Sequence, residues 1–221
     1  GPREGVGNAI AGHYAHQRNG ISLILLGSRN VSLLEKMGQE MGASEIVGGD
    51  IFDPESSAYK RAMNVRSAIF VQNAAFNMDT MQGEDKVALK EAQDLSRRQQ
   101  TEYFQNLVDA QIKQISAGAR LLINVNSVTS LSERGASKYP YMGMKRDQAL
   151  YAEGKRAELK QAGVELVQLR PGAIRTNMMD HLTDEKAVAL ANILMKRETA
   201  PADRPHGYAQ DFIFQKGEIA A

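Results

Sequence analysis

The chain has 221 residues, of which 43% are hydrophobic, so it can bury one substantial core, and we expect residues 1–221 to form one domain. A formal net charge of +1 gives no overall attraction to nucleic acid or to an anionic membrane, and we expect neither as a partner. No apolar run approaches the roughly 20 residues that cross a bilayer, and cysteine is absent, so we expect a cytoplasmic protein that acts on small molecules.

Short apolar runs alternate with helical segments along the whole chain. Strands are predicted at residues 21–26, 45–48, 68–72, 120–125 and 164–169, of which 45–48 is the weakest. Helices are predicted at residues 31–41, 86–115 and 141–161. This alternation predicts an α/β fold, a Rossmann-type doubly wound parallel sheet flanked by helices. Ligands of such sheets bind at the carboxyl ends of the strands, where we therefore look for a site.

The chain opens with a glycine-rich loop, in which Gly1, Gly5 and Gly7 enclose Arg3 and Val6 and precede a helix-like segment. Such glycines allow a tight turn and close backbone approach to a pyrophosphate, and the helix N-terminus favours its charge. A flexible terminus explains the same composition. The strand that should precede this loop is missing from the sequence: either it lies upstream of Gly1, or it is lost and leaves a gap in the sheet beside the cofactor.

No metal site is predicted. The chain lacks cysteine ligands, and its histidines number four. His13 and His16 can share a helix face, but no carboxylate completes a recognised metal-binding spacing, so we expect them on a solvated surface.

The loops after the next two strands carry polar candidates for the adenosine end of a dinucleotide. Ser28 and Arg29 stand where an enzyme specific for NAD usually has an acidic residue, and a basic residue there suits the extra phosphate of NADP(H). A solvated loop charge is the alternative for Arg29. Asp50, followed by Ile51, can accept a hydrogen bond from the adenine amino group, or it can cap the next helix.

Tyr141 and Lys145 stand four residues apart, which places them on one face of a helix. A nearby ammonium lowers the pKa of a phenol and brings it closer to neutral pH, so the pair suits proton transfer. Ser127 follows a predicted strand, where its hydroxyl can bind a substrate carbonyl.

Two further segments follow predicted strands. Asn73, Ala74 and Ala75 are small residues that a cofactor can approach closely. After the last strand, Pro and Gly fix a turn, and this segment supplies the candidates Pro171, Gly172, Ile174 and Thr176.

In these motifs the chain resembles the short-chain dehydrogenase/reductase family over nearly its whole length. The matching positions are the glycine loop at Gly1, Gly5 and Gly7, the Asn-Ala-Gly motif at Asn73, Ala74 and Ala75, the serine at Ser127, the Tyr-x-x-x-Lys pair at Tyr141 and Lys145, and the turn at Pro171 and Gly172. The resemblance implies interconversion of a small-molecule carbonyl and alcohol, with hydride exchanged with NADP(H). It implies that Tyr141 is the general acid, that Lys145 lowers its pKa and binds the nicotinamide ribose, and that Ser127 orients the carbonyl.

Two positions depart from the family pattern. The family's helix asparagine, which holds a proton-relay water, corresponds by counting back from Ser127 to Gln99, whose longer side chain can also hold a water. Ala75 replaces a glycine, which is tolerated if its backbone is not left-handed. Because of Gln99 and the missing first strand, a catalytically silent dinucleotide-binding sensor or scaffold stays open as an alternative.

A nucleotide-sugar epimerase or dehydratase is a third reading, although such enzymes need a longer chain for their substrate lobe. The resemblance also implies a homodimer or homotetramer, paired through the helices at 86–115 and 141–161.

Overall fold

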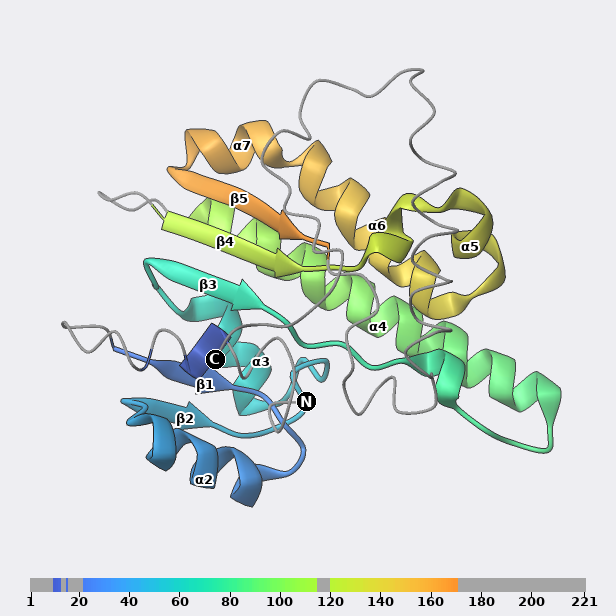
Figure 1. Ribbon diagram of the computed structural model, residues 1–221, viewed down its shortest axis with the longest axis horizontal. Helices are drawn as coiled ribbons and strands as arrows, with labels where there is room; N and C mark the ends of the chain where they lie inside the picture. The colour runs from blue at the N-terminus through green and yellow to red at the C-terminus, as the bar shows by residue number, and fades with distance from the viewer. Residues whose placement is uncertain (1–9, 13–14, 16–21, 115–119, 171–221) are drawn as a thin grey trace, which may run out of the picture.

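The computed structural model describes residues 10–12, 15, 22–114 and 120–170 (Figure 1). Within them the strands are β1 (Ile24–Leu26), β2 (Glu45–Val47), β3 (Ile69–Gln72), β4 (Arg120–Val125) and β5 (Val164–Leu169). The longer helices are α2 (Val31–Met41), α3 (Ser57–Asn64), α4 (Lys86–Lys113) and α6 (Pro140–Gly154). Shorter helical segments are η1 (Met78–Thr80), η2 (Val128–Leu131), α5 (Glu133–Lys138) and α7 (Arg156–Gln161).

Every strand pairing in the described residues is parallel, as predicted. β1 pairs with β2, and β3, β4 and β5 pair in that order. Helices connect successive parallel strands, which gives the expected βα alternation. The strand arrowheads point to the same side in Figure 1, so the loops that follow them gather at one edge of the molecule.

The sheet is interrupted between β1 and β3 in the part of the chain that the structure describes. These two strands lie side by side in Figure 1, but their pairing partners place them in separate sheets. The interruption separates the loops at the carboxyl ends of β1 and β2 from those of β3 and β4.

Helix α4 packs against both groups of strands. Phe104 and Val108 lie in one buried cluster with Leu122 of β4 and Leu166 of β5. Tyr103 and Leu107, one position earlier in each turn, lie in a second buried cluster, and Leu26 and Val47 pack against it. Its members are Ile51, Ala58, Ala62, Tyr103 and Leu107. Adjacent positions of one helix therefore hold the two sheets together by burying apolar side chains.

The helix predicted at residues 141–161 is divided, which corrects the sequence prediction. The chain leaves α6 after Gly154 and re-enters a helix at Arg156, with Lys155 between them at φ −95° and ψ 0°. α3 and α5 are both absent from the prediction, because each is short and follows a polar stretch in which apolar spacing gives little signal. The predicted strands and the other two helices are confirmed to within a few residues of their ends.

Candidate active site

Helix α6 carries Tyr141 in its first turn and Lys145 one turn later. The Lys145 Nζ atom lies 5.9 Å from the centroid of the Tyr141 ring, so the two side chains share a face. Lys145 is 2% exposed, and its Nζ donates a hydrogen bond to the carbonyl oxygen of Val125 at 3.0 Å. The ammonium is thus fixed against the last residue of β4.

Asn126, directly after β4, is hydrogen-bonded to the backbone of both Lys145 and Ser127. Its buried side-chain amide donates to the backbone oxygen of Lys145 at 3.0 Å, and its Oδ1 accepts from the backbone N–H of Ser127 at 2.8 Å. Sequence reasoning did not select Asn126, although its place between Val125 and Ser127 is a usable signal. One buried amide therefore orients the turn of α6 that bears Lys145 and the start of the loop that bears Ser127.

The Ser127 hydroxyl keeps its own proton available. Its Oγ accepts from the backbone N–H of Thr129 at 3.2 Å and from the Thr129 hydroxyl at 2.9 Å. A serine hydroxyl has one donor and two acceptor positions, so these contacts use the acceptors and leave the donor. Ser127 can therefore donate to an oxygen placed beside it.

Burial shifts the two titratable groups in opposite directions. It raises the pKa of Tyr141 to about 12, with a smaller contribution from the negative charge of Asp79, and lowers the pKa of Lys145 to about 8. The net shift of the Tyr141 pKa is upward because burial disfavours the phenolate, and the expectation that Lys145 lowers this pKa stays a prediction. Tyr141 is therefore protonated at neutral pH, as a proton donor must be.

The loop after β1, at the other end of the candidate site, has a strained backbone and a charged side chain. Ser28 has φ +80°, in the left-handed region that non-glycine residues rarely adopt. Arg29 has a side chain 71% exposed, lies 3.6 Å from the Asp50 carboxylate and is stacked 5.9 Å from the centroid of the Phe76 ring. Because Phe76 follows β3, this contact crosses the interruption in the sheet.

The structure excludes the interpretation of Asp50 as a helix cap, and the hydrogen bond from the adenine amino group stays a prediction. Ser56, not Asp50, caps α3 by accepting from the backbone N–H of Tyr59. The Asp50 carboxylate instead accepts from the backbone N–H of Phe52 at 3.0 Å and pairs with Arg29, which keeps it in the loop. Ile51 is buried, and its side chain belongs to the apolar cluster that includes Ala58 and Ala62 of α3.

The segment Asn73, Ala74 and Ala75 follows β3 and is partly buried. The buried Gln72 side chain brackets it by donating to the backbone oxygen of Ala74 at 3.0 Å. Ala75 does not have a positive φ, so an alanine is accommodated there as predicted.

Gln99 lies on the exposed side of α4, and the inward-facing residue of that turn is Gln100. The Gln100 side chain accepts from the backbone N–H of Phe76 at 2.7 Å and donates to the Phe76 oxygen at 3.1 Å. Counting back from Ser127 therefore selects Gln99, one position before the residue that faces the interior. Because Gln99 is exposed, its position does not suit the role of holding a water in the site. Gln100 holds the β3 loop instead.

Nine of the predicted contact residues lie outside the described part of the chain. They are Gly1, Arg3, Gly5, Val6, Gly7, Pro171, Gly172, Ile174 and Thr176. His13 and His16 also lie outside it.

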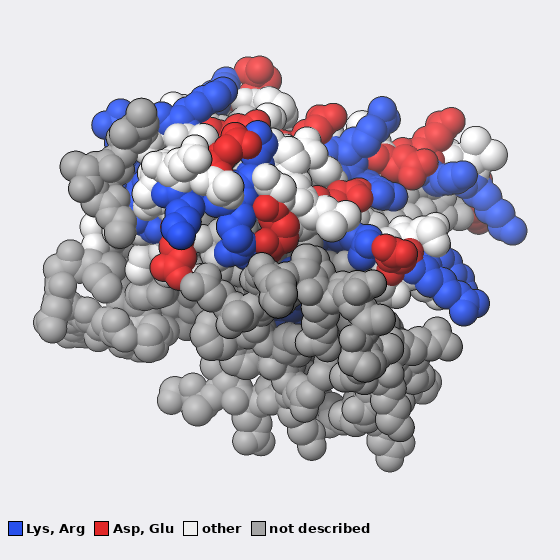
Figure 2. Space-filling view, turned by 90° about the horizontal axis from the view of Figure 1, so that it is seen from above, with Lys and Arg blue, Asp and Glu red and all other residues white. Residues whose placement is uncertain are grey.

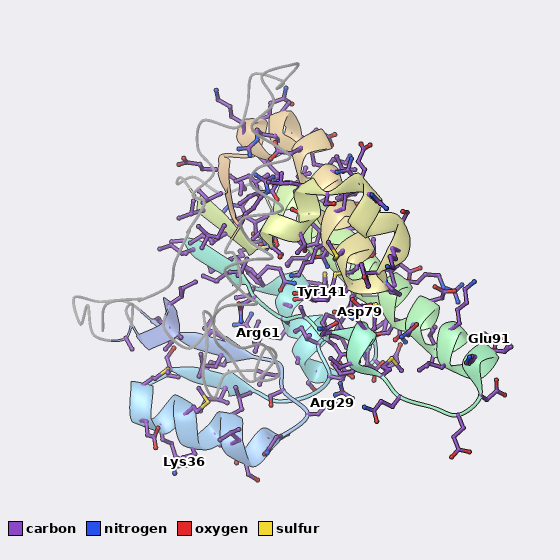
Figure 3. All side chains as sticks on the ribbon, turned by 45° about the vertical axis from the view of Figure 1, so that its right-hand side comes forward. Arg29, Lys36, Arg61, Asp79, Glu91 and Tyr141 are labelled. Atoms are coloured by element: carbon purple, nitrogen blue, oxygen red, sulfur yellow. The ribbon has the colours of Figure 1, made fainter. Side chains whose placement is uncertain are left out.

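Four further features of the described residues bear on function. Acidic and basic side chains are interspersed over the face seen in Figure 2. None of the described helices has the length and apolarity to cross a membrane, and no cluster of His, Asp and Glu with metal-binding geometry occurs among the same residues. A hollow of about 480 Å³ is lined by Glu91, Asp94, Arg97 and Arg98 of α4, and Figure 3 shows Glu91 far along α4 from Tyr141. Its lining is charged, which does not suit a planar apolar ring.

Together the fold and the site geometry define a Rossmann-type α/β protein with the architecture of the short-chain dehydrogenase/reductases. No family model and no curated protein matches the sequence. Among solved structures, a short-chain dehydrogenase from Sphingobium yanoikuyae in complex with NADPH is similar at TM-score 0.66 and 20% identity, over 100% of this chain and 87% of that chain. A short-chain dehydrogenase from Burkholderia cenocepacia J2315 in complex with NADP is similar at TM-score 0.63 and 22% identity, over 93% of this chain and 82% of that chain.

A protein described as ribose-5-phosphate isomerase from Brucella melitensis 16M has the same fold, at TM-score 0.63 and 18% identity, over 82% of this chain and 69% of that chain. These similarities confirm the family resemblance at the level of the fold. Because one fold carries several chemistries, the reaction must be argued from the site itself.

Proposed function

We propose that this chain is an NADP(H)-dependent oxidoreductase of the short-chain dehydrogenase/reductase type, which interconverts a carbonyl and an alcohol on a small molecule. The observation that carries the proposal is the buried Lys145 beside Tyr141, anchored to the strand end that leads to Ser127. A buried ammonium costs stability, so its position against a phenol favours a chemical role over a structural one.

The groups at the strand ends suit the two ends of a dinucleotide. Arg29 offers an exposed guanidinium for a 2′-phosphate, and Asp50 offers an acceptor for the adenine amino group. At the other end, Lys145 offers an ammonium for ribose hydroxyls. When bound, such a cofactor supplies or accepts the hydride.

Proton transfer falls to the residues of the chain. In reduction, Tyr141 donates its phenolic proton to the carbonyl oxygen, while the Ser127 hydroxyl donates a hydrogen bond to the same oxygen and holds it in place. Lys145 stabilises the phenolate that remains. In oxidation the phenolate accepts the proton of the alcohol, so the same groups act in reverse.

The test is cofactor oxidation with a panel of small aldehydes and ketones. Tyr141→Phe and Lys145→Ala should each reduce turnover by roughly 10²- to 10⁴-fold, the range for loss of a general acid. Tyr139→Phe is the matched control, because Tyr139 is an exposed tyrosine just before α6 and should keep full activity.

Wild-type rates in both variants would exclude the mechanism. Binding of NADPH without any turnover, unchanged in Tyr141→Phe, would instead favour the sensor or scaffold.

We also propose that the protein is a homodimer or homotetramer in the cytoplasm. Leu95 of α4 and Leu150 of α6 are exposed and lie on the two helices that the family resemblance assigns to pairing. Light scattering of the purified protein tests this, and a monomer at micromolar concentration would contradict it.

A further inference from the structure

Helix α6 lacks a cap of its own. α2, α3 and α4 begin after Asn30, Ser56 and Asp85, and each of these accepts a hydrogen bond from the first turn of its helix. α6 begins after Tyr139, whose side chain makes no such bond, and its first residue is Pro140. The first backbone N–H groups of a helix need acceptors, so the helix that carries Tyr141 must obtain one from elsewhere.

Asp79 supplies that acceptor from a distant part of the chain. Its Oδ1 atom lies 3.3 Å from the backbone N of Tyr141, and Figure 3 shows the two residues next to each other, one from η1 and one from α6. A carboxylate at this position also lies at the positive end of the α6 dipole.

Asp79 is itself held in place. Its backbone N–H donates to the side chain of Asn77 at 3.1 Å, and the preceding Met78 is fully buried. Gln93 of α4 donates to the Met78 oxygen at 3.0 Å. The backbone that carries the Asp79 carboxylate is therefore anchored in a turn beside α6.

The charge of Asp79 acts on the phenol as well as on the helix. It raises the pKa of Tyr141 in addition to the effect of burial, and desolvation in turn raises the pKa of Asp79. Most other charged groups around α6 already have a partner. Arg97 pairs with Asp147, and Arg146 pairs with Glu133. Lys138 lies over the Tyr139 ring, and Lys145 donates to the Val125 oxygen. η2 adds hydroxyl groups, and α7 adds charges only beyond the far end of α6.

We propose that Asp79 is a positioning residue for Tyr141, which fixes the first turn of α6 and places a carboxylate beside the residue that bears the phenol. This inference rests on the proposed function, since it concerns the placement of the residue that donates the proton in reduction. It assigns a role in the reaction to the loop between β3 and α4.

Two variants separate the charge of Asp79 from its hydrogen bond. Asp79→Asn keeps an acceptor oxygen for the Tyr141 N–H and removes the charge, whereas Asp79→Ala removes both. Asp53→Asn is the matched control, because Asp53 also accepts from a backbone N–H, that of Glu55 at 3.0 Å, but lies in the loop before α3.

The first measurement is the chemical shift of the Tyr141 backbone amide as a function of pH. In the unmutated protein it should follow a single titration with the midpoint of a carboxyl group, and this titration should vanish in Asp79→Asn and persist in Asp53→Asn. A Tyr141 amide that does not titrate in the unmutated protein would overturn the contact, whether or not the protein is an enzyme.

The second measurement is the pH profile of alcohol oxidation with NADP⁺ and a panel of small secondary alcohols. Asp79→Asn should shift the rising limb to lower pH by about half a unit, because the phenolate forms more readily without the neighbouring charge. Asp79→Ala should show the same shift and also lower kcat about threefold or more, because the helix turn loses its anchor. Profiles identical to that of the unmutated protein would overturn the role, while absence of turnover in every protein would refute the proposed function alone.

Discussion

The two ends of the candidate site are built in different ways. At the β1 end, the exposed Arg29 and the half-buried Asp50 lie on two neighbouring loops, held by an ion pair of 3.6 Å and by the stacking of Arg29 on Phe76. At the β4 end, Lys145 is buried and hydrogen-bonded to the strand, and Asn126 fixes the neighbouring backbone. Salt and water weaken the first set of interactions, whereas the second set is shielded from both.

In the proposed function, the β1 end contributes to the choice of cofactor and the β4 end carries out the reaction. An exposed guanidinium can contribute to the choice of cofactor without disturbing the core, so a substitution there should change affinity and little else. A buried ammonium affects the stability of the whole chain, so a substitution there should change stability and reaction together. The following substitutions test this difference, beginning with the largest expected effect on stability or binding.

Gly143, between Tyr141 and Lys145, should tolerate no side chain. A Cβ atom there would lie 2.8 Å from the backbone oxygen of Ala136 and 2.9 Å from the Arg97 guanidinium. Gly143→Ala should lower the free energy of unfolding by about 2–3 kcal/mol, the range for overpacking against backbone. Gly154→Ala in the same helix meets nothing within 4 Å and should be neutral or slightly stabilising in urea unfolding. Equal stability of the two variants would show that the buried end is less tightly packed than described.

Lys145→Met should stabilise the protein near neutral pH while abolishing turnover. The pKa of Lys145 is about 8 in the folded chain, against an ordinary value of 10.5, so the folded state binds fewer protons than the unfolded state between these values. The cost of burying the charge is therefore fully present below pH 8 and falls as the pH rises toward 10.5.

Urea unfolding should show a gain of about 2 kcal/mol at pH 7 for Lys145→Met, reduced from the full pKa effect because the Val125 oxygen loses its donor. The gain should shrink above pH 8. Lys160→Met, at an exposed position in α7, should show no such pH dependence. A gain that is constant up to pH 11 would contradict the buried charge as its cause.

Arg29→Ala should affect binding rather than folding. We expect the unmutated protein to prefer NADPH over NADH, and the variant to lose about tenfold of that preference, which corresponds to about 1.4 kcal/mol. Nucleotide fluorescence titrations at two salt concentrations measure both affinities, and the preference should be smaller at high salt. Lys36→Ala, which removes an exposed charge from α2, is the control. Equal affinity for both cofactors in the unmutated protein would refute the assignment.

Ser28→Gly should have the smallest effect of these substitutions, and it should stabilise the protein. Glycine adopts φ +80° without steric cost, so the substitution should raise the free energy of unfolding by up to about 1 kcal/mol. Ser32→Gly, inside α2, should lower it by a similar amount, because glycine there only adds freedom to the unfolded chain. A loss of stability in Ser28→Gly would mean that its hydroxyl contact to the Asn30 oxygen outweighs the backbone strain.

Local pattern was sufficient for most of the fold. The buried strand Arg120–Val125 is rich in Leu, Ile and Val, and α4 shows its apolar spacing plainly at Tyr103, Phe104, Leu107 and Val108. The same spacing rule placed Tyr141 and Lys145 on one face of α6. These features depend on neighbours within one or two turns, which a sequence displays directly.

Features that depend on distant contacts were not predicted. Asp79 meets Tyr141 across 62 residues, and nothing near Asp79 marks it as a partner of α6. Gln100 rather than Gln99 faces the interior because of the rotation of α4 about its axis, which counting from Ser127 does not give. The pKa of Tyr141 depends on burial, which spacing alone does not report.

The length of α4 has a mechanical consequence. Its 28 residues make a rod of about 42 Å, and its Tyr103 and Phe104 side chains insert into different apolar clusters on either side of the break in the sheet. A rigid rod cannot tilt against one cluster without also tilting against the other. The Gln148 side-chain amide donates to the Gln100 backbone oxygen at 3.1 Å, so the same helix is also tied to α6, which carries Lys145.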